Sequence, residues 1–341
     1  MLLSIQEKYN DNILLEILKR YDVEKEKVIF IGGFDSYVYE FSKNDNDYIL
    51  KITHSFRRSA NYILGEIDWL NFMADKGLAV ARAIPSIFGN FVETFGDNEA
   101  YFISILYEKA PGHLPTEADW NSSLFEEWGR ITGKLHAVTK TYKSKNPTSK
   151  RNEWIDEEHL NIEKYIPSDQ SIVIQKSKDL LERLKKITPG TENYGLIHGD
   201  LHFLNFTVED GRITLFDFDD IAYNYFANDI AVILFYTYWR PLKQSDCKKS
   251  FINEFLSSFL KGYNQENHFQ EEWFSQLQDF LRLRHLVQYI AFLQSVDIAS
   301  LDNDEIAFMR HMEKVIEQNY LIVDFDFEMF SKQLPLNKRV R

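Results

Sequence analysis

The chain has 341 residues, which is enough for two lobes with separate hydrophobic cores. Its formal net charge of −13 argues against nucleic acid or an anionic membrane as a partner, so we expect neither. The apolar run from Ile230 to Trp239 is too short to span a bilayer, and the N-terminal residues show no signal-peptide pattern. Cys247 is the only cysteine, so no intrachain disulfide can form, which favours a reducing, cytoplasmic location.

The first part of the chain changes its hydrophobic period twice. Ser4 to Arg20 has helical spacing, whereas residues 27–41 read as a strand, a glycine turn and a second strand. The turn contains Gly32 and Gly33. A third strand is expected over residues 48–53. The three strands together predict an antiparallel meander.

Lys51 lies in the middle of the third predicted strand, and Glu66 lies in the helix predicted over residues 53–74. A lone strand lysine is usually an outward-facing residue, and a lone helix glutamate is usually solvated. Taken together after a glycine turn, they favour a lysine that is fixed by a glutamate and holds nucleotide phosphates.

Further strands are predicted over residues 83–87, 90–94 and 101–106, and the last of these is continuously apolar. It leads into Glu108 to Gly112, a segment with the composition of a hinge. We therefore place the boundary between an N-terminal part, residues 1–107, and a C-terminal part, residues 108–341.

The C-terminal part is predicted to be mainly helical. Residues 140–151 are polar and basic and predict a surface loop. Helices are expected over residues 124–139, 160–166, 171–187, 227–238, 251–263, 271–295 and 304–319.

The stretch from Gly195 to Asp220 carries a dense group of polar side chains at the ends of short apolar runs. Such groups need a hydrogen-bond partner, a cation or a substrate. The turn at residues 209–212 can bring Asn205 and Asp217 together as oxygen ligands of a hard divalent cation, with Asp200 beside them as a base.

Structural roles stay open for the other polar residues near this stretch. His198 fits an anchor for the loop backbone or for Asp229, and Asp229 equally fits a helix N-terminal residue. His202 fits either a residue that orients the loop or a buried histidine. Asp219 and Asp220 fit a second metal contact, an acidic wall for an acceptor, or capping positions.

These motifs, in this order, resemble those of the aminoglycoside phosphotransferase and choline kinase family, the small-molecule branch of the protein-kinase-like fold. The likeness covers roughly residues 28–238. It rests on the segments IGGFDSYVYEF, YILKIT, GRITGKLHAVT, HGDLHFLNF and FDFDD. Gly199 stands where protein kinases usually carry an arginine. The resemblance implies an α+β, bilobal fold with a small N-terminal lobe built on an antiparallel sheet and a larger, mainly helical C-terminal lobe.

The resemblance also implies ATP and Mg²⁺ as cofactors. Asp200 would be the catalytic base, Asn205 and Asp217 would hold the metal, and Lys51 with Glu66 would bind the phosphates. The remaining nucleotide contacts would come from the glycine turn and the hinge, at Gly32, Gly33, Ser36, Leu106 and Tyr107.

The expected acceptor is a hydroxyl of a small molecule such as an amino alcohol, an aminoglycoside or a homoserine-like compound. Aromatic residues Tyr236, Tyr238 and Trp239, with Asp219 and Asp220, could cage a cationic group, although a packed aromatic core is the better explanation for most of the aromatic residues. A Ser/Thr protein kinase is the alternative, but the segment between Asp217 and Asp229 is short and no Ala-Pro-Glu motif is evident. A nucleotide-binding pseudokinase is a further alternative. The presence of a suitable residue at every catalytic position argues against it. The sequence carries no signal for the oligomeric state.

Overall fold

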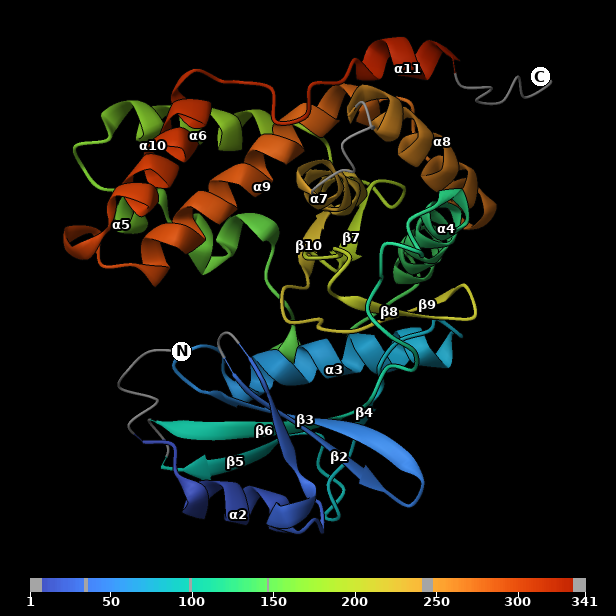
Figure 1. Ribbon diagram of the computed structural model, residues 1–341, viewed down its shortest axis with the longest axis vertical. Coiled ribbons are helices and arrows are strands. Elements are labelled where there is room, and N and C mark those ends of the chain that lie inside the picture. Colours follow the sequence, from blue (N-terminus) through green and yellow to red (C-terminus); the bar gives the residue numbers. More distant parts are fainter. Residues whose placement is uncertain (1–7, 34–35, 98–99, 146, 241–247, 334–341) are drawn as a thin grey trace. The chain divides into compact units, whose positions relative to one another are not determined.

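A computed structural model describes residues 8–33, 36–97, 100–145, 147–240 and 248–333 (Figure 1). Its contacts divide the chain into two compact units. The first unit comprises Met1–His113, Thr141–Arg151 and Phe206–Asp219, and the second comprises Leu114–Lys140, Asn152–Asn205 and Asp220–Arg341. Cys247 and the start of the helix predicted from Ser4 lie outside the described residues. The boundary predicted between residues 107 and 108 stays a prediction.

The first unit is built on a six-stranded antiparallel sheet. The path β1-β2-β3-β6-β4 forms the sheet, and β5 also pairs with β6. The strands are β1 (Ile29–Gly32), β2 (Tyr37–Lys43), β3 (Asn46–His54), β4 (Ala83–Ile84), β5 (Glu93–Gly96) and β6 (Tyr101–Glu108).

The alternation of side chains along β3 explains how this sheet positions a lysine. Leu50 and Ile52 are fully buried and belong to a core cluster that also contains Leu14 and Ile17 of α2 (Asp11–Lys19). Because successive side chains of a strand point to opposite faces, Lys51 faces away from this cluster. In Figure 1, α2 and α3 (Ala60–Asp75) lie on opposite sides of the sheet.

Two later segments belong to the first unit because they pack directly on it. The hairpin of β8 (Phe206–Glu209) and β9 (Arg212–Leu215) is bound at Leu215, whose backbone pairs with Ala79 and Ala81. The segment 141–151 packs against α3 at Gly65, where an added Cβ would lie 1.9 Å from the carbonyl oxygen of Ser149. Arg151 is only 3% exposed, so the prediction of a surface loop is wrong at that residue. Its guanidinium is bound by protein groups in place of water, because it donates to the backbone oxygens of Tyr62 and Asp219.

The second unit contains most of the helices and one short strand pair. β7 (Tyr194–Ile197) pairs antiparallel with β10 (Ala222–Tyr225). The helices are α4 (Ser122–Thr139), α5 (Ile162–Tyr165), α6 (Ser171–Leu184), α7 (Phe226–Trp239), α8 (Lys248–Glu266), α9 (Trp273–Ser295), α10 (Asn303–Glu317) and α11 (Phe327–Gln333). Nearly every residue of α7 is buried, as expected of a helix that is apolar on all sides.

Glycines allow α4 and α8 to pack with their backbones in close contact. A Cβ added at Gly129 of α4 would lie 1.8 Å from the carbonyl oxygen of Phe259, and one added at Gly262 of α8 would lie 1.8 Å from that of Glu126. We expect Gly129→Ala to destabilise the protein by about 1–3 kcal/mol, because the two helices must separate and this outweighs the better helix propensity of alanine.

Thermal unfolding of purified variants tests this expectation. Gly190→Ala is the matched control, because a Cβ there would meet only the side chain of Asn193 at 3.7 Å. Equal melting temperatures for the Gly129 and Gly190 variants would contradict the account of this helix contact.

The α+β prediction is confirmed, and the differences lie at the ends of elements. The helix predicted from residue 53 begins at Ala60, because β3 continues to His54 and the Ser59 side chain caps the helix by accepting from the Tyr62 N–H. α11 was not predicted from the sequence, since its apolar residues are too few to show a period. Among the described residues, no helix is both long enough and apolar enough to cross a membrane.

Candidate active site

Lys51 forms the centre of a charged cluster in the first unit. Its Nζ lies 2.9 Å from Oδ1 of Asp217 and 2.7 Å from Oδ1 of Asp219, and its side chain is 13% exposed. Arg57, in the turn after β3, binds the second oxygen of Asp219 at 2.5 Å. The strand lysine is therefore held by two carboxylates of the FDFDD segment, not left in solvent.

The charges of this cluster stabilise one another. Burial lowers the pKa of Lys51, but the carboxylates of Asp217 and Asp219 outweigh this and leave it above its ordinary value. Burial would raise the pKa of Asp219, yet the cations Lys51, Arg57 and Arg58 hold it well below its usual range. Both partners are thus charged at neutral pH, so the cluster contains a cation that its carboxylates hold in place.

Glu66 has a different partner from the one the sequence suggested. It is 1% exposed, and its Oε1 accepts a hydrogen bond from the Tyr107 hydroxyl at 2.9 Å. Arg151 lies 4.0 Å from its other oxygen and also donates to the carbonyl oxygen of Asp219 at 2.6 Å. Among the described residues there is no Lys51–Glu66 ion pair within 4.0 Å, because Asp217 and Asp219 occupy the lysine.

Burial explains the protonation of these groups. It raises the pKa of Glu66, and the nearby Asp219 adds to this effect. Burial and then Glu66 raise the pKa of Tyr107 well above its usual range, so the phenol stays protonated and donates. Tyr107, predicted as an adenine contact, therefore has its hydroxyl directed to Glu66.

The glycine turn after β1 has the backbone geometry that only glycine accepts readily. Gly32 and Gly33 have φ values of +118° and +129°, and a Cβ on Gly33 would lie 2.1 Å from the carbonyl oxygen of Ser36. Ser36 is buried at 7% exposure. The close approach at Gly33 is made by the chain's own backbone, and the predicted contacts of the turn with phosphates stay a prediction.

The predicted hinge is partly occupied by backbone pairing. Leu106 is buried and pairs with both Leu50 and Ile84. The N–H of Glu108 donates to the carbonyl oxygen of Arg82, and that of Lys109 donates to Asp47. An adenine contact at Leu106 and Tyr107 therefore remains a prediction, and the Glu108 N–H is not free to make one.

Asp200 is the centre of a second cluster, in the second unit. Its Oδ1 pairs with Nη2 of Arg284 in α9. Its Oδ2 lies 3.2 Å from Nδ2 of Asn205 and 3.3 Å from Nε2 of His202. The His202 ring packs on Tyr236 of α7, with ring centroids 4.4 Å apart. Each oxygen of the predicted base thus has its own donors, which fixes the carboxylate.

Asn205 and Asp217 have the properties that a hard divalent cation requires. Nδ2 of Asn205 donates to the backbone oxygen of Asp200 at 2.8 Å, which leaves its amide oxygen without a hydrogen bond among the described residues. Asp217 has a side chain that is 45% exposed and a φ of +59°, an uncommon conformation for a residue other than glycine. Amide and carboxylate oxygens are each suitable ligands for Mg²⁺, and their predicted role as ligands of one ion stays a prediction.

Within the described residues, no group of three or more His, Cys, Asp or Glu side chains is arranged to hold a metal. The prediction of an Mg²⁺ site is left untested by this finding, since Mg²⁺ keeps water and phosphate ligands and needs only one or two protein carboxylates.

Asp229 anchors the backbone of the loop that carries Asp200. Its carboxylate accepts from the N–H groups of His198 at 3.1 Å and Gly199 at 2.8 Å, and from Nε2 of His136 at 3.1 Å. Asp229 and His136 are both fully buried. Of the two alternatives for Asp229, the structure supports the partner of the loop.

The His136 tautomer follows from its two partners. The Asp229 carboxylate can only accept, so Nε2 carries the proton, and Nδ1 accepts from the Tyr263 hydroxyl at 2.8 Å. Burial lowers the pKa of His136 and keeps the ring neutral. The Leu-His pair at the end of GRITGKLHAVT is therefore a support for the loop.

Gly199 is required by the fold of the same loop. Its φ is +79°, and an added Cβ would lie 2.3 Å from the carbonyl oxygen of Asp220. The arginine that protein kinases usually carry here does not fit this backbone.

Several residues of these clusters were missed in the sequence. They are Arg57, Arg151 and Arg284, of which the last lies in α9, far along the chain from Asp200. A basic residue in a helix is usually solvated, so no local pattern marks Arg284. The one signal that could have found it is a charged residue among the apolar residues of a helix.

The aromatic rings of the predicted cage for a cationic acceptor already lie against cations of the protein itself. Nζ of Lys248 lies 4.5 Å from the ring centre of Tyr238 and 5.1 Å from that of Trp239. The guanidinium of Arg284 lies 5.0 Å from the ring centre of Tyr236. Because each ring already has a cation over one face, a cationic acceptor stays a prediction.

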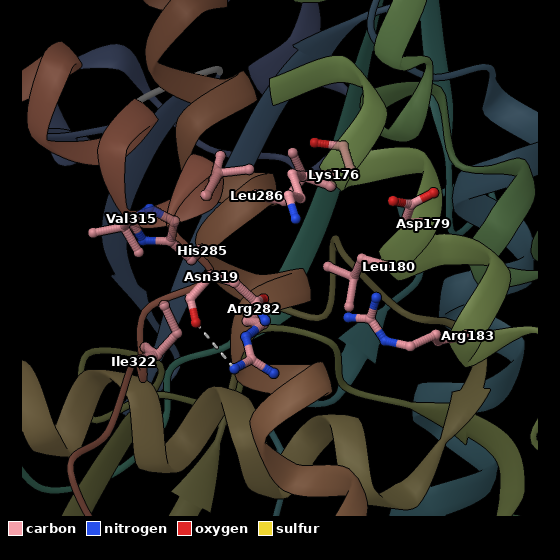
Figure 2. A pocket seen from close by; sticks show the side chains of 12 residues that line it. Lys176, Asp179, Leu180, Arg183, Arg282, His285, Leu286, Val315, Asn319 and Ile322 are labelled. Carbon is pink, nitrogen blue, oxygen red and sulfur yellow. Dashed lines mark hydrogen bonds between the residues drawn. The ribbon is translucent and has the colours of Figure 1, made fainter. Parts of the chain in front are cut away.

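A cavity of about 70 Å³ lies among α6, α9 and α10 (Figure 2). Figure 2 shows charged residues on its wall, including Lys176, Asp179 and Arg282. It is much smaller than the roughly 300–1,000 Å³ typical of ligand pockets. None of the predicted site residues lines it, so it is not the candidate active site.

Comparison with known proteins identifies the class to which this arrangement belongs. The sequence matches the model of the phosphotransferase enzyme family over residues 28–275, so the chain belongs to that family. The predicted resemblance and the prediction of a phosphotransferase enzyme are thereby confirmed.

Particular relatives narrow the comparison. Amicoumacin kinase of Bacillus subtilis (strain 168) is 42% identical over 320 residues, covering 94% of this chain and 95% of that protein. A solved structure of amicoumacin kinase in complex with AMP-PNP, Ca²⁺ and Ami has a TM-score of 0.93 at 41% identity and covers 96% of this chain and 99% of that chain. Its AMP-PNP and Ca²⁺ agree with the cofactor prediction of ATP and a divalent cation.

A microcompartment-associated aminopropanol kinase has a TM-score of 0.71 at 20% identity, covering 91% of this chain and 97% of that chain. At this identity the likeness shows the fold alone.

Proposed function

We propose that this protein is a kinase that transfers the γ-phosphoryl group of ATP to a hydroxyl of amicoumacin or of a closely similar small molecule. The observation that carries the proposal is the 42% identity to amicoumacin kinase over nearly the whole of both chains. The two charged clusters, around Lys51 and around Asp200, supply the chemistry that such a transfer requires.

Asp200 is the proposed base. A carboxylate oxygen of Asp200 accepts the proton of the acceptor hydroxyl as the bond to phosphorus forms. Its fixed orientation supports this role, because Oδ1 accepts from Arg284 and Oδ2 accepts from Asn205. A general base must hold one geometry to act on an attacking hydroxyl.

Lys51, Asn205 and Asp217 are the proposed phosphate and metal residues. Lys51 neutralises phosphate oxygens of ATP, and Asn205 and Asp217 contribute oxygen ligands to Mg²⁺. The bound Mg²⁺ supplies charge neutralisation at the phosphate oxygens. The free amide oxygen of Asn205 and the exposed carboxylate of Asp217 support this assignment.

A panel of acceptors tests the proposal. ADP formation is measured with Mg-ATP and amicoumacin, an amino alcohol, an aminoglycoside, homoserine and a generic protein substrate. We expect turnover with amicoumacin and none with the protein substrate. Turnover on the protein alone would favour the protein kinase alternative, and nucleotide binding without turnover on any acceptor would favour the pseudokinase.

Lys51→Met tests the phosphate assignment. Removing a fixed cation from the phosphates is expected to lower kcat/KM for ATP by about 100-fold, with a smaller effect on KM for the acceptor. Steady-state kinetics with ATP as the varied substrate provide the measurement. Lys43→Met is the matched control, because Lys43 is also a strand lysine paired with an aspartate, Asp22. Wild-type kinetics for Lys51→Met would reduce Lys51 to a structural residue.

A further inference from the structure

Arg284 of α9 is bound to the proposed base by a direct ion pair. One nitrogen, Nη2, donates both to Oδ1 of Asp200 and to the hydroxyl of Tyr236, the latter at 2.5 Å. The same hydroxyl accepts from Nε2 of Gln288 at 3.0 Å. Residues 284 and 288 are one turn apart on α9, so both side chains can donate to the same Tyr236 hydroxyl. This hydroxyl in turn fixes the position of the Arg284 guanidinium.

The electrostatic surroundings keep this guanidinium charged. Its side chain is 8% exposed, and burial lowers its pKa, but Asp200 and Tyr236 outweigh burial and leave the pKa above its ordinary value. Asp220 adds a further favourable charge. A charged guanidinium at this depth has its main compensation in the Asp200 carboxylate, so each of the two residues determines where the other lies.

The other oxygen of Asp200 is fixed from a different direction. Oδ2 has Asn205 and His202 as its neighbours, both on the loop that carries Asp200. These loop residues move with the loop, whereas Arg284 belongs to a 23-residue helix. Arg284 is therefore the contact that ties the carboxylate to a rigid element outside its own loop.

We propose that Arg284 is a positioning residue, which holds the Asp200 carboxylate in the single rotamer from which it accepts the acceptor's proton. The inference rests on the proposed function, since it assigns Arg284 to the same base. No local pattern in the sequence marks this residue, and its role differs from the one proposed for Lys51. Its hydrogen bonds go to Asp200 and Tyr236, so we expect its loss to lower the rate of transfer and to leave nucleotide binding unchanged.

The first test compares kinetic constants. Arg284→Met keeps the length of the side chain and removes the charge, and we expect kcat to fall by about 10- to 100-fold, the usual effect of removing a residue that orients a reacting group. KM for ATP should stay within about twofold of wild type. Arg284→Lys should recover part of the loss, because the ammonium keeps a positive charge for Asp200 but lacks the planar, rigid geometry of the guanidinium.

Arg282→Met is the matched control. Arg282 lies on the same helix, two residues away, and is also bound to an aspartate, Asp279, at 2.9 Å. It donates in addition to the backbone oxygen of Asn319, the contact marked by the dashed line in Figure 2. If loss of an ion-paired arginine of α9 acts only through stability, both variants should melt early and lose the same activity. We expect loss of kcat only for Arg284→Met.

A double-mutant cycle with Asp200→Asn gives the decisive result. If Arg284 acts through Asp200, then Arg284→Met should cause no further loss in the Asp200→Asn background. An equal additional loss in that background, or a wild-type kcat for Arg284→Met, would overturn the inference while the assignment of the base stands. A wild-type rate for Asp200→Asn would instead overturn the proposed base itself. If Arg284→Met does not fold, Arg284→Lys carries the same cycle.

Discussion

Asp200→Asn is expected to lower kcat by about 10²- to 10⁴-fold, the usual contribution of a general base. The amide has almost the shape of the carboxylate but cannot accept the proton of the acceptor hydroxyl. Because the proposed phosphate contacts lie at Lys51, Asn205 and Asp217, the dissociation constant for ATP should change little. Single-turnover phosphoryl transfer and nucleotide titration, both on the purified variant, measure the two quantities separately.

The structure shows why asparagine is a better choice than alanine at this position. Alanine would leave the guanidinium of Arg284 with neither a charge nor an oxygen acceptor at residue 200, whereas the asparagine amide keeps an oxygen that can accept from it. Removing one partner of a buried ion pair costs about 3–5 kcal/mol. The cost here lies at the lower end, since the Asp200 side chain is 21% exposed. Activity lost in Asp200→Ala would therefore mix chemistry with unfolding.

The control for Asp200→Asn is Asp210→Asn, in the exposed turn between β8 and β9. This change removes a carboxylate from the same stretch of chain without touching either cluster, so its kinetics should match wild type. If Asp200→Asn, folded and able to bind ATP, transfers phosphate at the wild-type rate, then Asp200 is not the base.

Asp229→Ala is expected to destabilise the second unit by about 3–5 kcal/mol, the largest stability effect that we predict. The substitution leaves three buried donors without an acceptor, the N–H groups of His198 and Gly199 and Nε2 of His136. Each unsatisfied buried donor costs about 1–3 kcal/mol, with partial relief from relaxation of the loop. A loss of this size is a large fraction of the roughly 5–15 kcal/mol by which native proteins are stable.

Denaturant unfolding measures the total loss, and hydrogen exchange locates it. We expect the amides of His198 and Gly199 to lose protection first, because Asp229 is their acceptor. Asp302→Ala is the control, since it removes an aspartate that caps α10 at the surface and should cost only about 1 kcal/mol. A midpoint for Asp229→Ala equal to that of Asp302→Ala would contradict the anchoring role.

The sequence was sufficient for the fold and for residues that belong to local patterns. The period of two in β3 separates Leu50 and Ile52 from Lys51, and the structure has this alternation. The glycine turn is similarly visible, because a positive φ at Gly32 and Gly33 restricts the residue type. Both patterns reflect backbone conformation, which depends on residues that are close together in the sequence.

The partners of these residues could not be predicted, because they are set by packing between distant segments. Glu66 was expected to pair with Lys51, but its direct partner is the Tyr107 hydroxyl, with Arg151 4.0 Å from its other oxygen. Arg284 is separated from Asp200 by 84 residues. Which charges meet across such distances depends on the docking of α9 and of segment 141–151, and neither is marked by a local motif.

The most direct test of the central claim is identification of the product. Purified protein is incubated with Mg-ATP and amicoumacin, and the acceptor is examined by mass spectrometry and ³¹P NMR. We predict one phosphate monoester on the acceptor for each ADP formed, with no product from Asp200→Asn on the same timescale. Protein that binds ATP but returns amicoumacin unmodified, while phosphorylating another acceptor or none, would contradict the proposed function.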